Sequence, residues 1–450
     1  MTTQTHQTRT DFSHLERMQN AHRHMSGWNY LIKVGEIVTV GRTTLRAKCH
    51  RLGLGSICRI VSGDAVGTLT EIISIDGTHA TLSVLGDAHQ ICVGDRIEYV
   101  SSGLEFTVPE KLLGSVLDGV GRPLSGDTML STRSLRAIKS DTVAALDRPV
   151  IDRAFQTGVP AIDCFSTLGQ GQRIALFGAP GCGKSTLLAS IISNCTADVV
   201  VIALVGERGR EVQEFLKRHI PEAVRKKTVM VVATSDRPPL ERTYAVHVAS
   251  SIAEDFRDKG QNVLLVVDSL TRAARAYREI GLAAGEPAVR RGFPASVYPA
   301  LPKIIERAGR TTKGSITAVY SVLVEGDSAS DPIADEIKSL TDGHIELSRE
   351  HADAGRFPAI DVVKSLSRVM PDVVGRDHME IARSARKLLA KYEDLKLLIQ
   401  IGEYQEGQDP EADEAIQKIA ALQNFIHQNT KHRPLPIRGM LAELRKVLKK

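Results

Sequence analysis

The sequence has few of the features that mark disulfide-stapled, zinc-binding or membrane-spanning proteins. Its six cysteines include no Cys-x-x-Cys pair, which argues against a zinc site or a disulfide framework and suits a reducing compartment. No apolar run approaches the ~18 residues that a membrane span needs. The N-terminal segment has no apolar stretch of the kind found in secretory signals, so we expect no such signal here.

Aromatic residues and net charge are also low. Phe, Trp and Tyr make up 4% of the chain, and 58 basic against 53 acidic residues leave a net charge of +5. A ring helicase needs stacking aromatics and a concentrated basic face. We therefore rank a helicase low and expect no nucleic acid among the partners.

Hydrophobic patterning divides the chain into four parts. Residues 1–26 read as a flexible segment, and residues 27–105 contain short β-branched runs separated by Gly and Asp, which predict a small β-barrel. Residues 106–370 hold near-continuous apolar strands with helices between them, as in a parallel sheet covered on both faces. Residues 371–450 are helical. The expected fold is an α/β P-loop (RecA-like) core with an N-terminal β-barrel and a C-terminal helical domain.

The elements expected from these patterns can be named by residue. Barrel strands are predicted at 33–40, 68–75, 79–85 and 95–100, and core strands at 173–177, 198–205, 228–234, 262–268 and 315–324. A Gly- and Pro-rich stretch at 114–126 resembles a junction. Helices are predicted at 381–401 and near 411–428.

The stretch GAPGCGKS at 178–185 carries the strongest motif. It fits G-x-x-x-x-G-K-[ST], the phosphate-binding loop, and stands between an apolar strand and a helix, the context this motif requires. The lysine of such a loop reaches the β- and γ-phosphates, and the next hydroxyl holds Mg²⁺. We therefore predict an ATP site with Mg²⁺ as cofactor, formed by Gly178, Ala179, Pro180, Gly181, Cys182, Gly183, Lys184, Ser185 and Thr186.

Charged residues follow two further strands at the edge where parallel sheets bind ligands. Asp268 ends the run VLLVVD and is predicted to orient Mg²⁺, a role that does not exclude capping of the helix that follows. Glu207 stands after the strand 198–205, where a carboxylate can polarise the water that attacks the γ-phosphate. Arg208 is predicted either to tether Glu207 or to contact phosphate.

Beyond these sites, long motifs resemble the catalytic subunits of rotary ATPases, and more closely the hexameric ATPases of type III protein export. The resemblance covers roughly residues 110–430. The motifs that carry it, in order, include TGVPAIDCFSTLGQGQR, GERGREVQEF, ATSDRPPLER, DSLTRAARAYREIGLAAGEP, DGHIELSRE, FPAID and SLSRVM.

The resemblance implies roles for particular residues. Lys184 and Ser185 would bind phosphate and Mg²⁺, Glu207 would be the catalytic carboxylate, and Asp268 would be the acid of the Walker B motif. Glu211 would lie in the outer shell of the metal.

Two more residues gain roles by the same resemblance. Phe357 falls where rotary enzymes stack an aromatic ring on adenine, with core packing as the alternative. Arg368 falls on the arginine finger that one subunit supplies to its neighbour.

The family resemblance also implies partners and a place of action. These are a homohexamer, a central stalk and peripheral regulators, secretion chaperones and effectors, and peripheral contact with the inner-membrane export gate from the cytoplasm. DRPPLER at 236–242 favours the injectisome branch, which serves virulence, over the flagellar branch. A non-catalytic nucleotide-binding ring subunit is disfavoured because Glu207 is present. Arg290 and Arg291 are expected either at the tip of a channel loop or as a solvated basic pair.

Overall fold

The structure is a computed structural model that describes residues 34–86, 90–109, 111–124, 132–139, 142–324, 331–427 and 435–449. The chain divides into two compact units, Met1–Ser102 and Gly103–Lys450. The segment 1–26, predicted to be flexible, lies outside the described residues. Among the helices of these ranges, none is long and apolar enough to cross a membrane.

The first unit holds a closed six-stranded barrel in the order β1-β2-β5-β4-β3-β6. Its strands are β1 (Val34–Val40), β2 (Thr44–Lys48), β3 (Ile57–Ile60), β4 (Leu69–Asp76), β5 (His79–Leu85) and β6 (Arg96–Ser101). All four predicted barrel strands are present. β2 and β3 escaped prediction because each is short and points charged side chains outward, Arg46 in β2 and Arg59 in β3.

The second unit is built on a sheet whose main path runs β21-β20-β12-β19-β15-β13-β14-β8. These strands are β21 (Ile360–Ser367), β20 (Gly343–Leu347), β12 (Arg173–Gly178), β19 (Ser315–Leu323), β15 (Asn262–Asp268), β13 (Val199–Val205), β14 (Thr228–Ala233) and β8 (Val116–Asp118). Neighbouring strands are parallel except for β21, which runs antiparallel to β20.

The burial of the central strands explains why their apolar runs predicted a parallel sheet covered on both faces. Every residue of β13 and of β14 is buried, and burial of one Val, Leu or Ile side chain contributes about 1.5–3 kcal/mol. Helices α6 (Pro239–Asp258) and α7 (Leu270–Ala283) pack against these strands. The five predicted core strands are therefore confirmed as β12, β13, β14, β15 and β19.

The strands at both ends of the sheet were not predicted. β21 alternates buried and exposed residues and carries Asp361 and Lys364, which hides it among polar segments. At the other end, the stretch 114–126 that resembled a junction contributes β8, which pairs with β14. Gly and Pro residues beside β8 masked a strand of only three residues.

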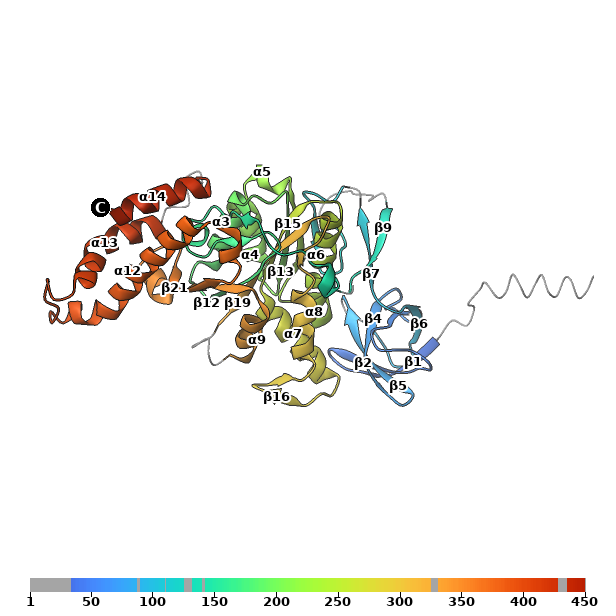
Figure 1. Cartoon of the computed structure of the whole chain (residues 1–450). Coiled ribbons are helices and arrows are strands. Elements are labelled where there is room, and N and C mark those ends of the chain that lie inside the picture. The colour runs from blue at the N-terminus through green and yellow to red at the C-terminus, as the bar shows by residue number, and fades with distance from the viewer. Residues whose placement is uncertain are drawn as a thin grey trace, which may run out of the picture. The chain divides into compact units, whose positions relative to one another are not determined.

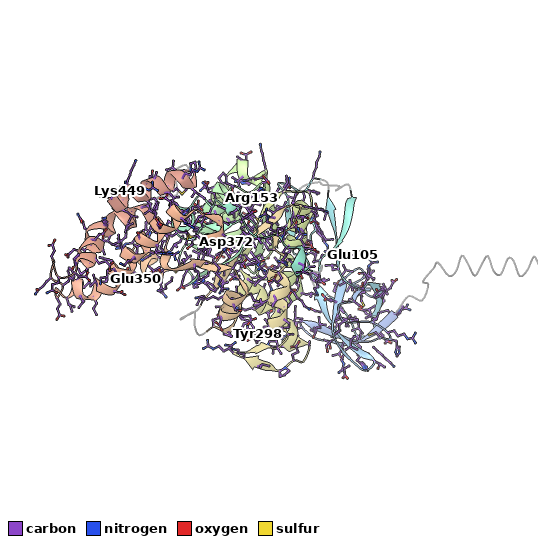
Figure 2. All side chains as sticks on the ribbon, viewed as in Figure 1. Glu105, Arg153, Tyr298, Glu350, Asp372 and Lys449 are labelled. Atoms are coloured by element: carbon purple, nitrogen blue, oxygen red, sulfur yellow. The ribbon has the colours of Figure 1, made fainter. Side chains whose placement is uncertain are left out.

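Three C-terminal helices complete the second unit, and the first of them, α12, packs beside β21 (Figure 1). They are α12 (Arg376–Gln400), α13 (Pro410–Ile426) and α14 (Ile437–Lys449). The predicted apolar stripe of α12 is buried at Ile381, Ala385 and Leu388. Farther along, Lys396 of α12 forms an ion pair with Glu350 of the core, which Figure 2 labels.

Candidate active site

The phosphate-binding loop connects β12 to α3 (Lys184–Asn194) at the carboxyl edge of the sheet. Gly183 caps the helix with a positive φ of 78°, a backbone conformation that favours glycine. Lys184 donates from Nζ to the Gly178 carbonyl at 2.6 Å, which holds its ammonium over the loop. Burial lowers the pKa of Lys184 to about 8. An incoming phosphate would favour its charged form.

The remaining loop residues divide by exposure. Pro180, Gly181, Ser185 and Thr186 are exposed, so the loop and the first turn of α3 are open to a ligand. Cys182 is 2% exposed and belongs to the hydrophobic core. Any contact with phosphate would therefore come from its backbone N–H, and its thiol is expected to react slowly.

Phe357 lies against this loop although it is far away in sequence. A Cβ placed on Gly183 would stand 3.1 Å and 3.2 Å from two ring carbons of Phe357. The ring is 44% exposed, so it is not a core side chain. An aromatic face beside a phosphate-binding loop is suited to stacking on a nucleotide base.

Acidic side chains from three elements converge beside the loop. Glu207 follows β13, Glu211 lies on α4 (Gly209–Glu214), and Asp268 ends β15 next to Leu204 of β13. Together with Ser185 they line one cavity of about 180 Å³. Ser269, not Asp268, caps α7 through its side chain. The Asp268 carboxylate is therefore available to the cavity.

Burial and the close approach of these three carboxylates shift their pKa values. Burial raises the pKa of Glu207 to about 7, and the hydrogen bond to Glu211 and the charge of Asp268 add to the effect. Burial also raises the pKa of Asp268, while the hydrogen bond with Glu207 lowers the pKa of Glu211. These acidic groups favour binding of a cation in the cavity, and they favour the charged form of Lys184 beside it.

The donor set of the cavity fits Mg²⁺. Oxygen ligands are what this ion prefers, and it usually takes few from the protein and the rest from water and substrate phosphates. Ser185 and Asp268 supply two such oxygens, with Glu211 behind them. No cluster of three or more His, Cys, Asp or Glu residues able to hold a metal by themselves occurs within the described ranges. Few protein ligands are expected at a Mg²⁺ site that takes its remaining ligands from phosphate oxygens and water.

Arg272, which the sequence analysis did not single out, holds the Glu207 carboxylate in place. Its Nη1 lies 2.7 Å from Glu207 Oε2 and also donates to the Gly206 carbonyl. Arg208 does not tether Glu207. Its side chain is 80% exposed, and its ion-pair contact within the described ranges is with Glu211, at 4.0 Å. The reason is geometric: Arg272 stands on the first turn of α7, which begins at the end of the neighbouring strand β15.

We expect Arg272→Met to lower kcat by about 10–100-fold, since small misplacements of a catalytic group cost up to about 10²-fold. Nucleotide binding should persist because the loop is unchanged. Arg272→Lys should recover little, because the ammonium stands on a different, flexible stem and lacks the fixed planar geometry that places Nη1 between both acceptors. Steady-state hydrolysis and equilibrium binding of a fluorescent ATP analogue measure the two effects. The exposed Arg349 gives the control Arg349→Met, and an unchanged kcat for Arg272→Met would contradict the tethering role.

Arg368 lies at the opposite edge of the sheet from this cavity. Its backbone N–H donates to the Asp342 carbonyl, and the N–H of Asp342 donates to the carbonyl of Arg173, the first residue of β12. The phosphate-binding loop follows the last residue of β12, about 20 Å away for a strand of 6 residues. Arg368 is exposed and, among the described residues, forms no ion pair. The structure therefore keeps Arg368 away from the phosphate-binding loop of its own chain.

The basic pair Arg290 and Arg291 lies at the exposed turn of a hairpin. Its strands are β16 (Ala288–Arg290) and β17 (Phe293–Pro294), and Arg291 turns the chain with a φ of 49°. Arg290 reaches Asp335 only at 4.0 Å. The channel role remains a prediction.

Comparisons with known proteins bear on the whole chain. The nucleotide-binding domain of the ATP synthase alpha/beta family matches residues 158–367, and the C-terminal domain of the type 3 secretion ATPase EscN matches residues 374–446. The type 3 secretion system ATPase of Pseudomonas syringae pv. syringae is 44% identical over 91% of this chain and 93% of its own length. The chain belongs to the type 3 secretion system ATPase family. It is thus an ATPase, and the resemblance described from its motifs is confirmed.

Further relatives agree with this assignment. The SPI-2 type 3 secretion system ATPase of Salmonella typhimurium is 46% identical over 88% of this chain and 90% of its own length. The flagellum-specific ATP synthase of Bacillus subtilis is 40% identical over 88% of this chain and 91% of its own length. The structure of assembled EscN from enteropathogenic E. coli superposes with a TM-score of 0.88 at 46% identity, covering 92% of this chain and all of that one. The predicted core, barrel and helical C-terminal region are those of the type 3 secretion ATPase fold.

Proposed function

We propose that this ATPase works as a ring of identical subunits, six by analogy with the export ATPases, and hydrolyses ATP at the interfaces between them. The observation that carries the proposal is the separation of Arg368 from the cavity that holds Lys184, Glu207 and Asp268. A closed ring brings one edge of a subunit against a different edge of the next. Each neighbour can then complete the site with its arginine. The assembled EscN structure supports such an oligomer.

Within each site the residues divide the work. The loop amides and Lys184 bind the phosphates, Phe357 stacks on the base, and Ser185 and Asp268 hold Mg²⁺ with Glu211 behind them. Mg²⁺ would neutralise charge on the phosphates. Glu207, oriented by Arg272, positions and polarises the attacking water. Arg368 of the neighbour stabilises the charge that develops during phosphoryl transfer.

The cellular role follows from the relatives. A homologous EscN has been solved in complex with its central stalk EscO, and we infer that this chain also binds a stalk through its ring. It would act in the cytoplasm at the inner-membrane base of an injectisome, where hydrolysis would release chaperones and drive unfolding and export of secreted proteins. The N-terminal barrel and the C-terminal helices offer surfaces for regulators, chaperones and effectors.

A deletion strain of the source bacterium tests the cellular role. We expect Glu207→Gln, supplied on a plasmid, to leave type III substrates inside the cell while the wild-type gene restores their appearance in the medium. Motility should be normal in both strains, because the flagellar enzyme is a separate relative. Loss of motility with normal secretion would assign the chain to flagellar export instead.

A further inference from the structure

Arg386 of α12 inserts its guanidinium between the C-terminal helices and the core. The two N–H groups of its Nη2 are shared among three acceptors: the Phe165 carbonyl at 2.7 Å, Ser166 Oγ at 2.8 Å and the Ser365 carbonyl at 3.1 Å. Phe165 and Ser166 follow the short helix α2 (Pro160–Asp163), and Ser365 lies in β21. One side chain therefore joins three segments that are far apart in sequence.

The partners of the guanidinium are carbonyl and hydroxyl oxygens. Within the described ranges, no carboxylate lies at ion-pair distance from Arg386, and its Nε is buried without a hydrogen-bond partner. Burial lowers the pKa of this group. Arg386 is partly buried, and removing a charge from water is costly unless the charge is paired and hydrogen-bonded. If packing alone were needed at this position, a neutral side chain of similar length would serve at lower cost.

The contact with β21 stands close to Arg368. Ser365 precedes Arg368 by three positions and is buried. The same end of β21 is held from the core side, where Gln172 Nε2 donates to Ser367 Oγ at 3.0 Å and Asp342 accepts from the Arg368 amide. On the α12 side, Arg386 contacts the Ser365 carbonyl of the same strand. Arg386 therefore adds a contact from α12 to a backbone segment that also pairs with β20.

We propose that Arg386 is a positioning residue that sets how Arg368 is presented to the neighbouring subunit. It thereby connects the C-terminal helices of one subunit with the active site of the next. This inference rests on the proposed function, since it takes Arg368 to act across the interface. A protein bound to the C-terminal helices could change hydrolysis through this contact without touching the nucleotide.

Arg386→Gln is the main test, because it removes the charge and the reach of the side chain. The subunit keeps its own Lys184, Glu207 and Phe357, so ATP binding and KM should stay as in the wild type. We expect kcat to fall by about 10–100-fold, the cost of misplacing a catalytic group by about 1 Å. A raised KM with unchanged kcat would place the effect at the Phe357 end of β21 and overturn the proposal.

Mixed rings separate a positioning role from general damage. An Arg386→Gln subunit has an intact cavity, and a Glu207→Gln neighbour has an intact Arg386 and Arg368. Mixing the two should therefore restore hydrolysis to the level that Arg368→Ala reaches in the same mixture. Arg272→Met impairs the same cavity as Glu207→Gln and should give no recovery. No recovery for Arg386→Gln, with recovery for Arg368→Ala, would contradict this inference alone, whereas failure of both would contradict the interface site itself.

Two further variants guard the experiment against misfolding. Arg383 is exposed one turn earlier on α12, and Arg383→Gln should keep full activity and the wild-type melting temperature. Ser166→Ala removes a single acceptor of Arg386 and keeps the buried charge. It should show a smaller loss of kcat with the same recovery in mixed rings. If Arg386→Gln does not fold, an unchanged kcat for Ser166→Ala would overturn the proposal.

Discussion

Two inactive variants, Arg368→Ala and Glu207→Gln, are expected to regain ATP hydrolysis when they are mixed. An arginine finger contributes about 10³–10⁵ in rate to phosphoryl transfer, so Arg368→Ala alone should be nearly inactive while still binding ATP. In a mixed ring, an Arg368→Ala subunit keeps Glu207 and can receive Arg368 from a Glu207→Gln neighbour. Random mixing in equal parts leaves about a quarter of the interfaces with both groups.

The structure makes this result expected because β12 separates Arg368 from the phosphate-binding loop of the same chain. The measurement is the steady-state rate of phosphate release before and after mixing. Rings labelled with two fluorophores provide the control that subunits have exchanged. If labelled rings contain both variants and hydrolysis stays at the level of the separate preparations, Arg368 does not act across the interface.

Glu207→Gln by itself should separate turnover from binding. A general base contributes about 10²–10⁴-fold to a rate, and the amide cannot accept a proton from water, so kcat should fall by that amount. ATP affinity should persist or rise slightly, because the substitution removes a negative charge from a cavity that Glu211 and Asp268 also line. Equilibrium binding of a fluorescent nucleotide beside single-turnover hydrolysis measures the two quantities.

Lys184→Ala provides the contrasting variant. It removes the ammonium that lies over the loop at Gly178, so both ATP affinity and hydrolysis should drop while the melting temperature without nucleotide changes little. An equal loss of affinity in Glu207→Gln and Lys184→Ala would reduce Glu207 to a structural role. Normal turnover of Lys184→Ala would remove the nucleotide site from this loop.

Parts of this protein could be predicted from the sequence because the residues that form them are neighbours along the chain. The phosphate-binding loop needs its glycines, lysine and hydroxyl in one short stretch, and these stand in order from Gly178 to Ser185. The buried strands β13 and β15 are recognisable in the sequence as continuous apolar runs. Glu207 and Asp268 stand at the ends of these runs. Strand, loop and acid therefore follow from the chain order alone.

The contacts between segments that are distant in sequence were decided only by the tertiary structure. Arg272 rather than Arg208 holds Glu207, because α7 starts beside the end of β13 once β13 and β15 pair. β21 brings Phe357 to the phosphate-binding loop at one end and carries Arg368 to the far edge at the other, since it runs antiparallel to β20. Strand order and direction arise from packing of the whole sheet, and no local pattern contains them.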